Sequence, residues 1–370
     1  MDWNKAKTYS SGAGLVVAAT IGAGIFALPE IFNRAGWVPT LFYVIFFSIL
    51  ISYSHFLYWR ARDGEPRDPG LLGLAGRELG KNAKALAFLS IVGGLSLTIV
   101  VQLVLGGQFL ALFLPMPNLT LPIFWLLASL PLLFGLKRFI VMENLGAALI
   151  AAIIVIIFFT SESPLAVFAS VPIHPGGVFL PFGAILFALA GWTSIEPLMS
   201  FTKSRKFLEK PFKLLLLGTT FVALLYLLFV SGVFGSISLI TSGTVSGAAG
   251  WPTWKLLALG ALGLFAIFNS HQSITLELKN SLERDASWNP IAALCFVVFV
   301  PIFLVWAGLN NILQVMGIAG GIFLSFQYLF IVLIFRKKMK PTGFHNLASG
   351  FLLFVFLAGA LYEIYYFIVK

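Results

Sequence analysis

The stretch Ala18-Ala19-Thr20-Ile21-Gly22-Ala23-Gly24-Ile25-Phe26-Ala27-Leu28-Pro29 lies inside the first hydrophobic segment of the chain, which runs from about Ser10 to Gly36. Glycine costs about 1 kcal/mol in a helix interior, and proline removes a backbone donor. Lipid offers no hydrogen-bond partner, so backbone groups freed by a break must be satisfied by protein, water or ligand. The stretch therefore predicts a helix broken at mid-membrane, whose free N–H groups and positive half-helix end suit an anion such as a carboxylate.

The composition is that of an integral membrane protein. Hydrophobic residues make up 59% of the chain, charged residues only 10%, and the mean hydropathy is +0.98, whereas a soluble domain is about 25% charged. The one cysteine, Cys295, excludes a disulfide within the chain. Apolar runs long enough to cross a bilayer predict eleven spans, at residues 10–35, 37–59, 83–114, 119–135, 139–160, 178–200, 211–235, 253–279, 289–307, 310–335 and 343–368.

The basic residues indicate how the chain is oriented. The net charge is +10, with 24 Lys and Arg residues. If the N-terminus is cytoplasmic, these spans leave only Arg34, Lys255 and Lys370 outside. Cytoplasmic loops carry an excess of Lys and Arg. We therefore predict a multi-pass protein of the cell membrane with its N-terminus in the cytoplasm and its C-terminus outside. The positive charge is explained by topology, and no nucleic-acid partner is expected.

A second interrupted helix is predicted near the middle of the chain. The segment from Pro181 to Pro197 places Gly191 at mid-span, with a proline six positions later, much as Pro29 follows Gly24 by five. Interrupted spans at corresponding places in two halves indicate an inverted-repeat transporter, although glycines in ordinary close packing are an alternative. The prediction is a single domain over 1–370, with a first repeat in 1–160, a second in 178–335 and an eleventh helix at 343–368.

The two motifs resemble those of amino acid permeases. The run Thr20 to Pro29 resembles the first span of permeases in the amino acid/polyamine/organocation (APC) superfamily, most closely the amino acid/auxin permease and aromatic amino acid permease groups. Gly191 with Pro197 resembles the sixth span of the same groups. The resemblance implies an all-α LeuT-type fold with a five-plus-five inverted repeat, discontinuous spans 1 and 6, and a substrate site between spans 1, 3, 6 and 8.

The chain also departs from the pattern of this family. It is short for the family, and Glu30 follows Pro29 where many relatives carry an aromatic or apolar residue. The acidic or histidine position just after the break of span 6 is Trp192-Thr193-Ser194 here.

The resemblance implies how the site would hold an amino acid. The N–H groups of Gly22, Ala23 and Gly24 would bind the carboxylate, and carbonyl groups near Ala19, Phe187 and Ala190 would bind the α-amine. Phe187, four residues before Gly191, matches an aromatic residue that closes over the substrate. The expected substrate-binding residues are Ala19, Gly22, Ala23, Gly24, Ile25, Phe26, Phe187, Ala190, Gly191, Trp192 and Gln102.

The residues near the breaks predict a neutral substrate. Helix ends can meet both charges of an amino acid, and an uncompensated charge at the bilayer centre costs at least about 2.5–3.5 kcal/mol. The expected wall is apolar or neutral: Phe26, Phe187, Trp192, and at most one of Gln102 and Gln108, which are six residues apart and point to different faces. For the aromatic residues, plain packing is an equal alternative. We expect a hydrophobic or aromatic amino acid.

The coupling ion is left open between Na⁺ and H⁺, and no other cofactor is expected. In the fold that the resemblance implies, a Na⁺ site would use oxygens of Ala18, Ile21, Ser270 and Ser273. For H⁺, His271 is a candidate because histidine can exchange protons near neutral pH, although a hydrogen-bonded helix contact is the more ordinary explanation, and Glu196 could simply cap a helix. The candidates for ion coupling are Ala18, Ile21, Asn269, Ser270, His271, Ser273 and Glu196.

Three other functions remain as alternatives: an uncoupled amino acid exchanger, a channel and a polytopic membrane enzyme. An enzyme would group His, Asp or Glu side chains, but the four histidines, at positions 55, 174, 271 and 345, are scattered. A channel would need a continuous polar lining, which the spans lack. We expect a secondary active transporter and not an enzyme, whose partners are its amino acid and the lipid bilayer. The sequence does not indicate an oligomeric state.

Overall fold

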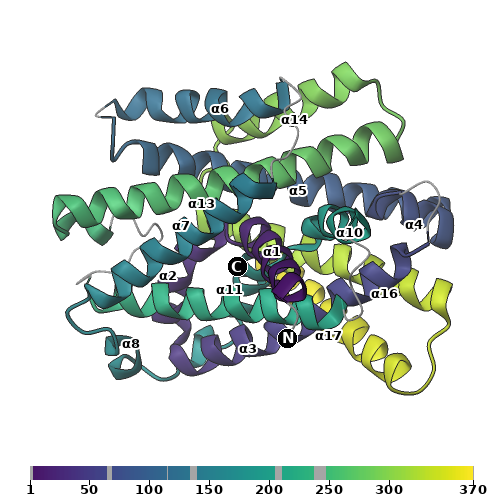
Figure 1. Ribbon diagram of the computed structural model, residues 1–370, viewed down its shortest axis with the longest axis horizontal. Coiled ribbons are helices and arrows are strands. Elements are labelled where there is room, and N and C mark those ends of the chain that lie inside the picture. Colours follow the sequence, from purple (N-terminus) through teal and green to yellow (C-terminus); the bar gives the residue numbers. More distant parts are fainter. Residues whose placement is uncertain are drawn as a thin grey trace.

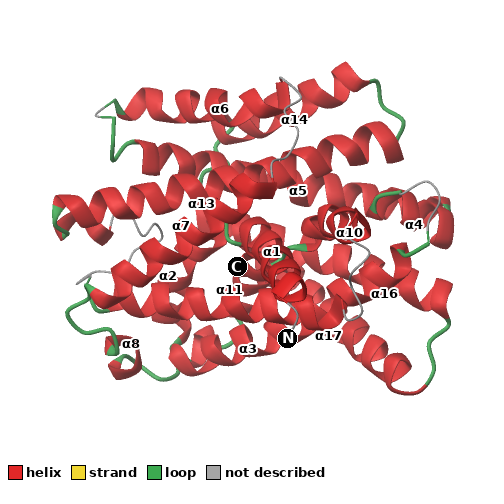
Figure 2. Ribbon diagram, in the orientation of Figure 1, coloured by secondary structure: helices red, strands yellow, loops and turns green. Residues whose placement is uncertain are grey.

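The computed structural model describes residues 3–64, 69–114, 116–133, 140–204, 211–236 and 247–369. Figure 2 shows that these residues form helices and loops and no strand. The helices are α1 (Trp3–Thr20), η1 (Ala23–Ala27), α2 (Leu28–Ala35), α3 (Trp37–Arg62), α4 (Leu71–Leu79), α5 (Lys81–Leu110), α6 (Pro117–Leu133), α7 (Ile140–Phe159), α8 (Ala166–Ala169), η2 (Pro175–Gly177), α9 (Pro181–Leu189), η3 (Trp192–Ser194), α10 (Ile195–Ser204), α11 (Pro211–Phe234), η4 (Ala248–Gly250), α13 (Thr253–Asn280), η5 (Ser281–Asp285), α14 (Pro290–Trp306), α15 (Ile312–Gly317), η6 (Ile318–Leu324), α16 (Ser325–Met339) and α17 (Gly343–Val369).

The described residues form an apolar helix, or a pair of half-helices, at the place of each of the eleven predicted spans. Seven segments have the length and hydropathy of a membrane span, among them Pro181–Thr202, and the bent pair Ser11–Thr20 and Ala23–Ala35 makes an eighth. Three shorter apolar helices, Asn118–Leu132, Leu145–Phe159 and Pro290–Trp306, occupy the places of spans 4, 5 and 9. The chain is therefore an all-helical, multi-pass membrane protein.

The broken spans are enclosed by the other helices. α1 packs against α7, α11 and α13, and α9 packs against α3 and η6. Figure 1 shows α1 near the centre of the view and α6 and α14 together at the upper edge, where both pack on α5. The eleventh helix is tied to the second broken span, because Glu363 of α17 is buried and accepts a 3.2 Å hydrogen bond from the Gly183 N–H of α9.

Both predicted helix breaks are present. α1 ends at Thr20 and η1 begins at Ala23, with the two halves of the span bent by 55°. α9 ends at Leu189 and η3 begins at Trp192. Pro29 lies in the first turn of α2, where a missing N–H removes no helical hydrogen bond. The proline therefore marks where the helix restarts, and the break itself falls on the residues before it.

The close approach of α13 to α5 depends on Gly263. A Cβ atom there would lie 2.3 Å from ring atoms of Phe109, which is fully buried. We expect G263A to lower the thermal unfolding midpoint of the detergent-solubilised protein, because overpacking a filled core costs about 1–3 kcal/mol. G350A is the matched control, since the nearest atom would be Nη1 of Arg336 at 3.6 Å. Equal midpoints for G263A and the wild type would contradict this packing.

Candidate functional site

A small cavity of about 40 Å³ lies between the two helix breaks. It is bounded by both broken spans together with α5, α13 and η6. Its described wall contains no Asp, Glu, Lys, Arg or His side chain, so the charges of a bound molecule would have to be met by backbone groups. The lining residues are Ala19, Thr20, Gly22, Ala23, Gly24, Leu95, Thr98, Gln102, Phe187, Ala190, Trp192, Thr193, Ser270, Ile274 and Leu324.

The backbone at the breaks supplies these polar groups. The first N–H groups and the last carbonyl groups of a helix have no partner within it, and they carry the partial charges of the helix dipole. Gly22, Ala23 and Gly24 lie at the start of η1, and Ala19 and Phe187 lie in the last turns of α1 and α9. One cavity thus faces a positive helix start and two negative helix ends, as the two charged groups of an amino acid require.

Gly22 and Gly24 are glycines because other parts of the chain pass close to them. A Cβ atom on Gly22 would lie 2.4 Å from Oγ of Ser270, and one on Gly24 would lie 2.5 Å from the Cα of Ala188. The first contact joins span 1 to α13. The second joins the two breaks through backbone atoms, which cannot move aside as a side chain can. Both glycines are therefore needed to bring the broken spans around one cavity.

Tyr226 of α11 links the two breaks, a feature that the sequence reasoning missed. Its hydroxyl oxygen lies 2.7 Å from the carbonyl oxygen of Ala188 and 3.2 Å from that of Thr20. A hydroxyl has one hydrogen to donate, so the two helix ends share it. Tyr226 thereby holds the ends of α1 and α9 at a fixed spacing. Its signal in the sequence is that it is the only tyrosine in span 7.

Trp192 is fixed as one wall of the cavity. Its Nε1–H donates to Oε1 of Gln327 at 2.7 Å, and Nε2 of Gln327 donates to the carbonyl oxygen of Ser90 at 2.8 Å. The ring also contacts Tyr58 edge-on, with ring centroids 6.1 Å apart. Since the side chain is 1% exposed and anchored to spans 3 and 10, it offers a rigid apolar surface to the cavity.

Gln102 joins the cavity to span 8. Its Nε2 donates to Oγ of Ser270 at 3.0 Å, and its Oε1 lies 3.0 Å from Nδ1 of His271. Because an amide oxygen only accepts, Nδ1 of His271 carries the hydrogen. Gln108 is exposed, so only one of the two glutamines lines the cavity, as predicted. Ser273 is buried on the same helix as Ser270 and His271.

The remaining predicted substrate residues lie outside the cavity wall. Ile25, Phe26 and Gly191 are not among its lining residues. The Phe26 ring packs instead between Phe109 and Phe229, with ring centroids 4.4 and 5.7 Å away. The other eight predicted residues do line the cavity, and the sequence reasoning missed Thr20, Leu95, Thr98, Thr193, Ile274 and Leu324.

The predicted ion-coupling residues do not gather at one place. Ala18 and Ile21 are buried at and just after the end of α1. α1 packs on α13, the helix that carries Ser270 and Ser273. Asn269 faces α7, because a Cβ atom on Gly146 would lie 2.3 Å from its Nδ2. Glu196 belongs to a separate group of charged residues.

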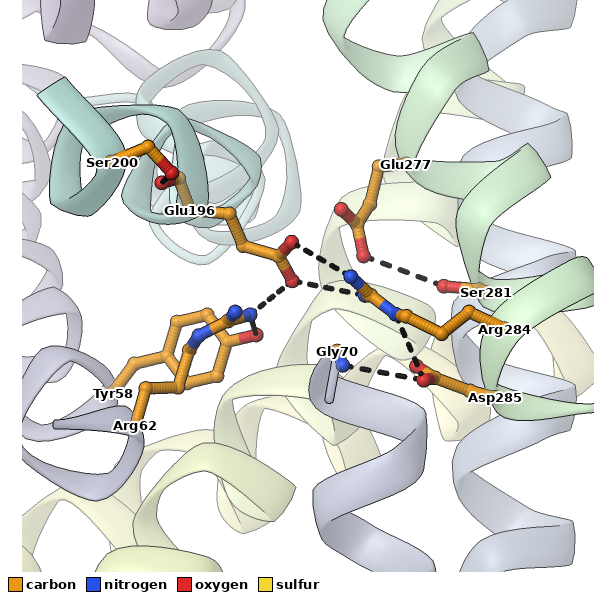
Figure 3. Close-up of polar contacts among 9 residues, drawn as sticks. All are labelled: Tyr58, Arg62, Gly70, Glu196, Ser200, Glu277, Ser281, Arg284 and Asp285. Carbon is orange, nitrogen blue, oxygen red and sulfur yellow. Dashed lines mark hydrogen bonds and ion pairs between the residues drawn. The ribbon is translucent and has the colours of Figure 1, made fainter. Parts of the chain in front are cut away.

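This charge cluster comprises Arg62, Glu196, Arg284 and Asp285, and Figure 3 shows the four side chains meeting between α3, α10 and η5. Glu196 pairs with Arg62 and accepts from two nitrogens of Arg284 at 3.2 and 3.3 Å. Asp285 accepts from Nε of Arg284 at 3.2 Å and from the backbone N–H of Gly70 at 3.3 Å. The cluster thus joins spans 2, 6 and 8 to the segment before α4.

The cluster closes one end of the bundle. Arg62 is 1% exposed and also donates to the hydroxyl of Tyr58 at 3.2 Å. Removing one partner of a buried ion pair leaves an uncompensated charge, at a cost of about 3–5 kcal/mol. Lys84 and Lys338 bind backbone carbonyls at this same end, at 2.6 Å each, and all these basic residues are among those predicted to be cytoplasmic.

Broken spans around a small buried site, with a closing charge cluster at one end, define a membrane transporter. The sequence model of the family described as "Transmembrane amino acid transporter protein" matches residues 5–235. The chain belongs to this family of amino acid transporters. A search of curated protein sequences found no match.

Solved structures of transporters share the fold. The structure of MhsT in complex with L-phenylalanine superposes with a TM-score of 0.73 at 13% identity, covering 96% of this chain and 97% of MhsT. A mutant of the manganese transporter of Eremococcus coleocola superposes with a TM-score of 0.65 at 11% identity, covering 100% of this chain and 90% of that protein. These similarities confirm the LeuT-type fold.

Adding a side chain at Gly24 should separate the two breaks. We expect G24A to abolish amino acid binding and uptake, because its Cβ would meet backbone atoms of Ala188 at 2.5 Å. G12A, on the same span, is the control: its Cβ would meet only the flexible side-chain ends of Leu214 and Leu198, at 3.0–3.4 Å. Radiolabelled uptake into proteoliposomes measures both variants, and wild-type uptake by G24A would rule out this arrangement of the site.

Proposed function

We propose that the protein is a secondary active transporter that carries a neutral amino acid, with a hydrophobic or aromatic side chain, across the cell membrane by alternating access. The observation that carries this proposal is the cavity between the two breaks, whose described wall has no charged side chain. Membership of the amino acid transporter family supports it, as does the L-phenylalanine bound in the MhsT complex.

Each part of the substrate would meet a different part of the site. The N–H groups of Gly22, Ala23 and Gly24 would bind the carboxylate. The carbonyl groups near Ala19, Phe187 and Ala190 would bind the ammonium group. The substrate side chain would then lie against the two large aromatic walls, Phe187 and Trp192, and the neutral Gln102. A side chain with a full charge would find no partner there and would be rejected.

The direction in which each end opens follows from the proposed topology. With a cytoplasmic N-terminus and an external C-terminus, the charge cluster closes the cytoplasmic end. Repeats 1–160 and 178–335 would then move against each other about the two breaks, with helix 343–368 outside both. Transport would require the cluster to separate, because it holds spans 2, 6 and 8 together.

The energy source is proposed to be a cation gradient. One candidate is Na⁺, bound by oxygens of Ala18, Ile21, Ser270 and Ser273, and the other is H⁺; both stay predictions. The alternative is amino acid exchange that is not coupled to a cation. Uptake into proteoliposomes of the purified protein distinguishes these three mechanisms. Uptake of L-phenylalanine, L-leucine and L-lysine is measured with an imposed Na⁺ gradient, with an imposed pH gradient, and with internal amino acid alone. Saturable uptake of the neutral amino acids over lysine supports the proposal, whereas no uptake of any of them refutes it.

Weakening the charge cluster should open the cytoplasmic end. In R62Q, Glu196 loses its most buried partner. The test uses a C295S background with a single cysteine placed at the cavity residue Thr193, and the maleimide is added at the cytoplasmic face. We expect this cysteine to be labelled faster in R62Q than with Arg62 present. The control is R77Q, which removes the ion pair between Arg77 and its neighbour Glu78 at the surface. Equal labelling rates for R62Q and R77Q would show that the cluster does not close this end.

A further inference from the structure

We propose that a second cavity, between α3, α16 and the start of α17, binds the phosphate group of an anionic phospholipid. Its volume is about 240 Å³, and it shares no lining residue with the cavity between the helix breaks. α16 packs on both α3 and α17 (Figure 1). The inference therefore concerns a separate site and does not depend on the proposed transport of an amino acid.

The wall of this second cavity carries basic side chains. Its lining residues include Arg60, Lys340 and His345 and no Asp or Glu. Among the described residues, neither Arg60 nor Lys340 has an ion-pair partner. The neighbouring Arg336 and Lys338 differ, because each binds a backbone carbonyl oxygen, at 3.0 and 2.6 Å. Two cations at the cavity are thus left for an anionic ligand.

Two of these side chains are held in place by aromatic rings. The guanidinium carbon of Arg60 lies 5.9 Å from the centre of the Phe56 ring, one turn earlier in α3. A guanidinium fork matches two oxygens of a phosphate. His345 stacks on the Tyr53 ring with centroids 6.1 Å apart, and its Nδ1 lies 2.6 Å from the Tyr53 hydroxyl. In the described part of the chain Nε2 of His345 has no hydrogen-bond partner, so this atom is available to a ligand.

Lys340 occupies a backbone position that ordinarily favours glycine. It follows the last residue of α16 with φ 44° and ψ 59°, in the left-handed region. Helices that end in this conformation commonly use glycine there, because the Cβ atom of other L-residues is strained. Strained backbone is retained where the surrounding structure or a function requires it. The turn alone gives no reason for a lysine, whereas a need for its charge at the cavity does.

The surroundings favour a lipid over a free anion. The apolar side chains of Phe56 and Phe335 line the same cavity as the basic ones. At its edge the Phe344 ring lies 5.9 Å from the His345 ring and is 73% exposed, and Leu347, one turn along α17, is 76% exposed. A basic pocket that continues into an exposed apolar helix face suits a headgroup together with its acyl chains. A free phosphate would use only the first part.

The position of the cavity in the bundle agrees with this ligand. Lys338 donates to the carbonyl oxygen of Ala61, which lies in the chain between Arg60 of the cavity and Arg62 of the charge cluster. This is the end of the bundle predicted to be cytoplasmic, where anionic lipids make the membrane surface negative and basic pockets between spans bind their headgroups. A bound lipid would join spans 2, 10 and 11 and would stabilise the folded state.

The test measures lipid binding to the full chain in detergent by native mass spectrometry. It gives the apparent dissociation constant of the first bound dioleoylphosphatidylglycerol, with dioleoylphosphatidylcholine as the zwitterionic comparison. We expect R60Q and K340N each to weaken phosphatidylglycerol binding about fivefold, which is what one basic residue near a membrane surface contributes. The matched control K337Q removes an exposed lysine of α16 that does not line the cavity, and it should bind this lipid as the wild type does.

A second measurement separates lipid binding from folding. Asparagine tolerates the left-handed region better than lysine does. K340N should therefore keep or raise the thermal unfolding midpoint in lipid-free detergent while it loses affinity for phosphatidylglycerol. Should K340N fold poorly, R60Q decides.

Four results would overturn the inference. The first is wild-type affinity for phosphatidylglycerol in both R60Q and K340N. The second is equal weakening by K337Q, because the attraction would then be a general one. The third is phosphatidylcholine binding as tight as that of phosphatidylglycerol. The fourth is displacement of the lipid by an equal concentration of inorganic phosphate, which would make a free anion the ligand. Each of these leaves the proposed transport function standing, because amino acid uptake is measured independently.

Discussion

The structure depends on one constraint: a backbone group freed inside a membrane must find a partner, because lipid has none to offer. Two spans of this chain are broken, and their free groups meet at one small cavity. Some find a partner within the protein: the hydroxyl of Tyr226 is shared as a hydrogen-bond donor between the carbonyl oxygens of Thr20 and Ala188. Those that line the cavity are the groups proposed to bind the substrate, in a wall whose lining residues include no charged side chain.

Close packing holds the breaks in place. Gly24 lies against backbone atoms of Ala188, and Gly22 lies against the side chain of Ser270. These contacts bring spans 1, 6 and 8 together, and the described residues that line the cavity include no ion pair. A network of ion pairs lies at one end, where Glu196 is shared between Arg62 and Arg284. A rigid site and a separable end are the two parts that alternating access needs.

Much of this could be predicted from the sequence, because glycine, proline and charge act locally. The run from Gly22 to Pro29 and the pair Gly191 and Pro197 located both breaks. The basic residues predicted to lie on one side of the membrane include both arginines of the charge cluster. The places of the apolar helices followed from apolar length alone. The side-chain wall was harder, since the direction of a ring is set by its neighbours: Phe26 turned away to pack on Phe109.

Contacts between distant spans could not be predicted. Tyr226 lies in span 7, and nothing in its local sequence shows that two helix ends converge on its hydroxyl. His55 and Tyr328 are 273 positions apart, and Gln102 meets His271 from a different span. In each case the residue type was visible in the sequence, but its partner depends on how helices far apart in the chain pack.

The central claim is that backbone groups at two helix breaks, and not side chains, bind the charged ends of an amino acid. Binding to the purified protein tests it most directly, with L-phenylalanine compared with phenethylamine, which lacks the carboxylate, and with 3-phenylpropionate, which lacks the amine. The account predicts that L-phenylalanine binds and that both analogues fail to compete with it. Binding of either analogue as tightly as L-phenylalanine would contradict it.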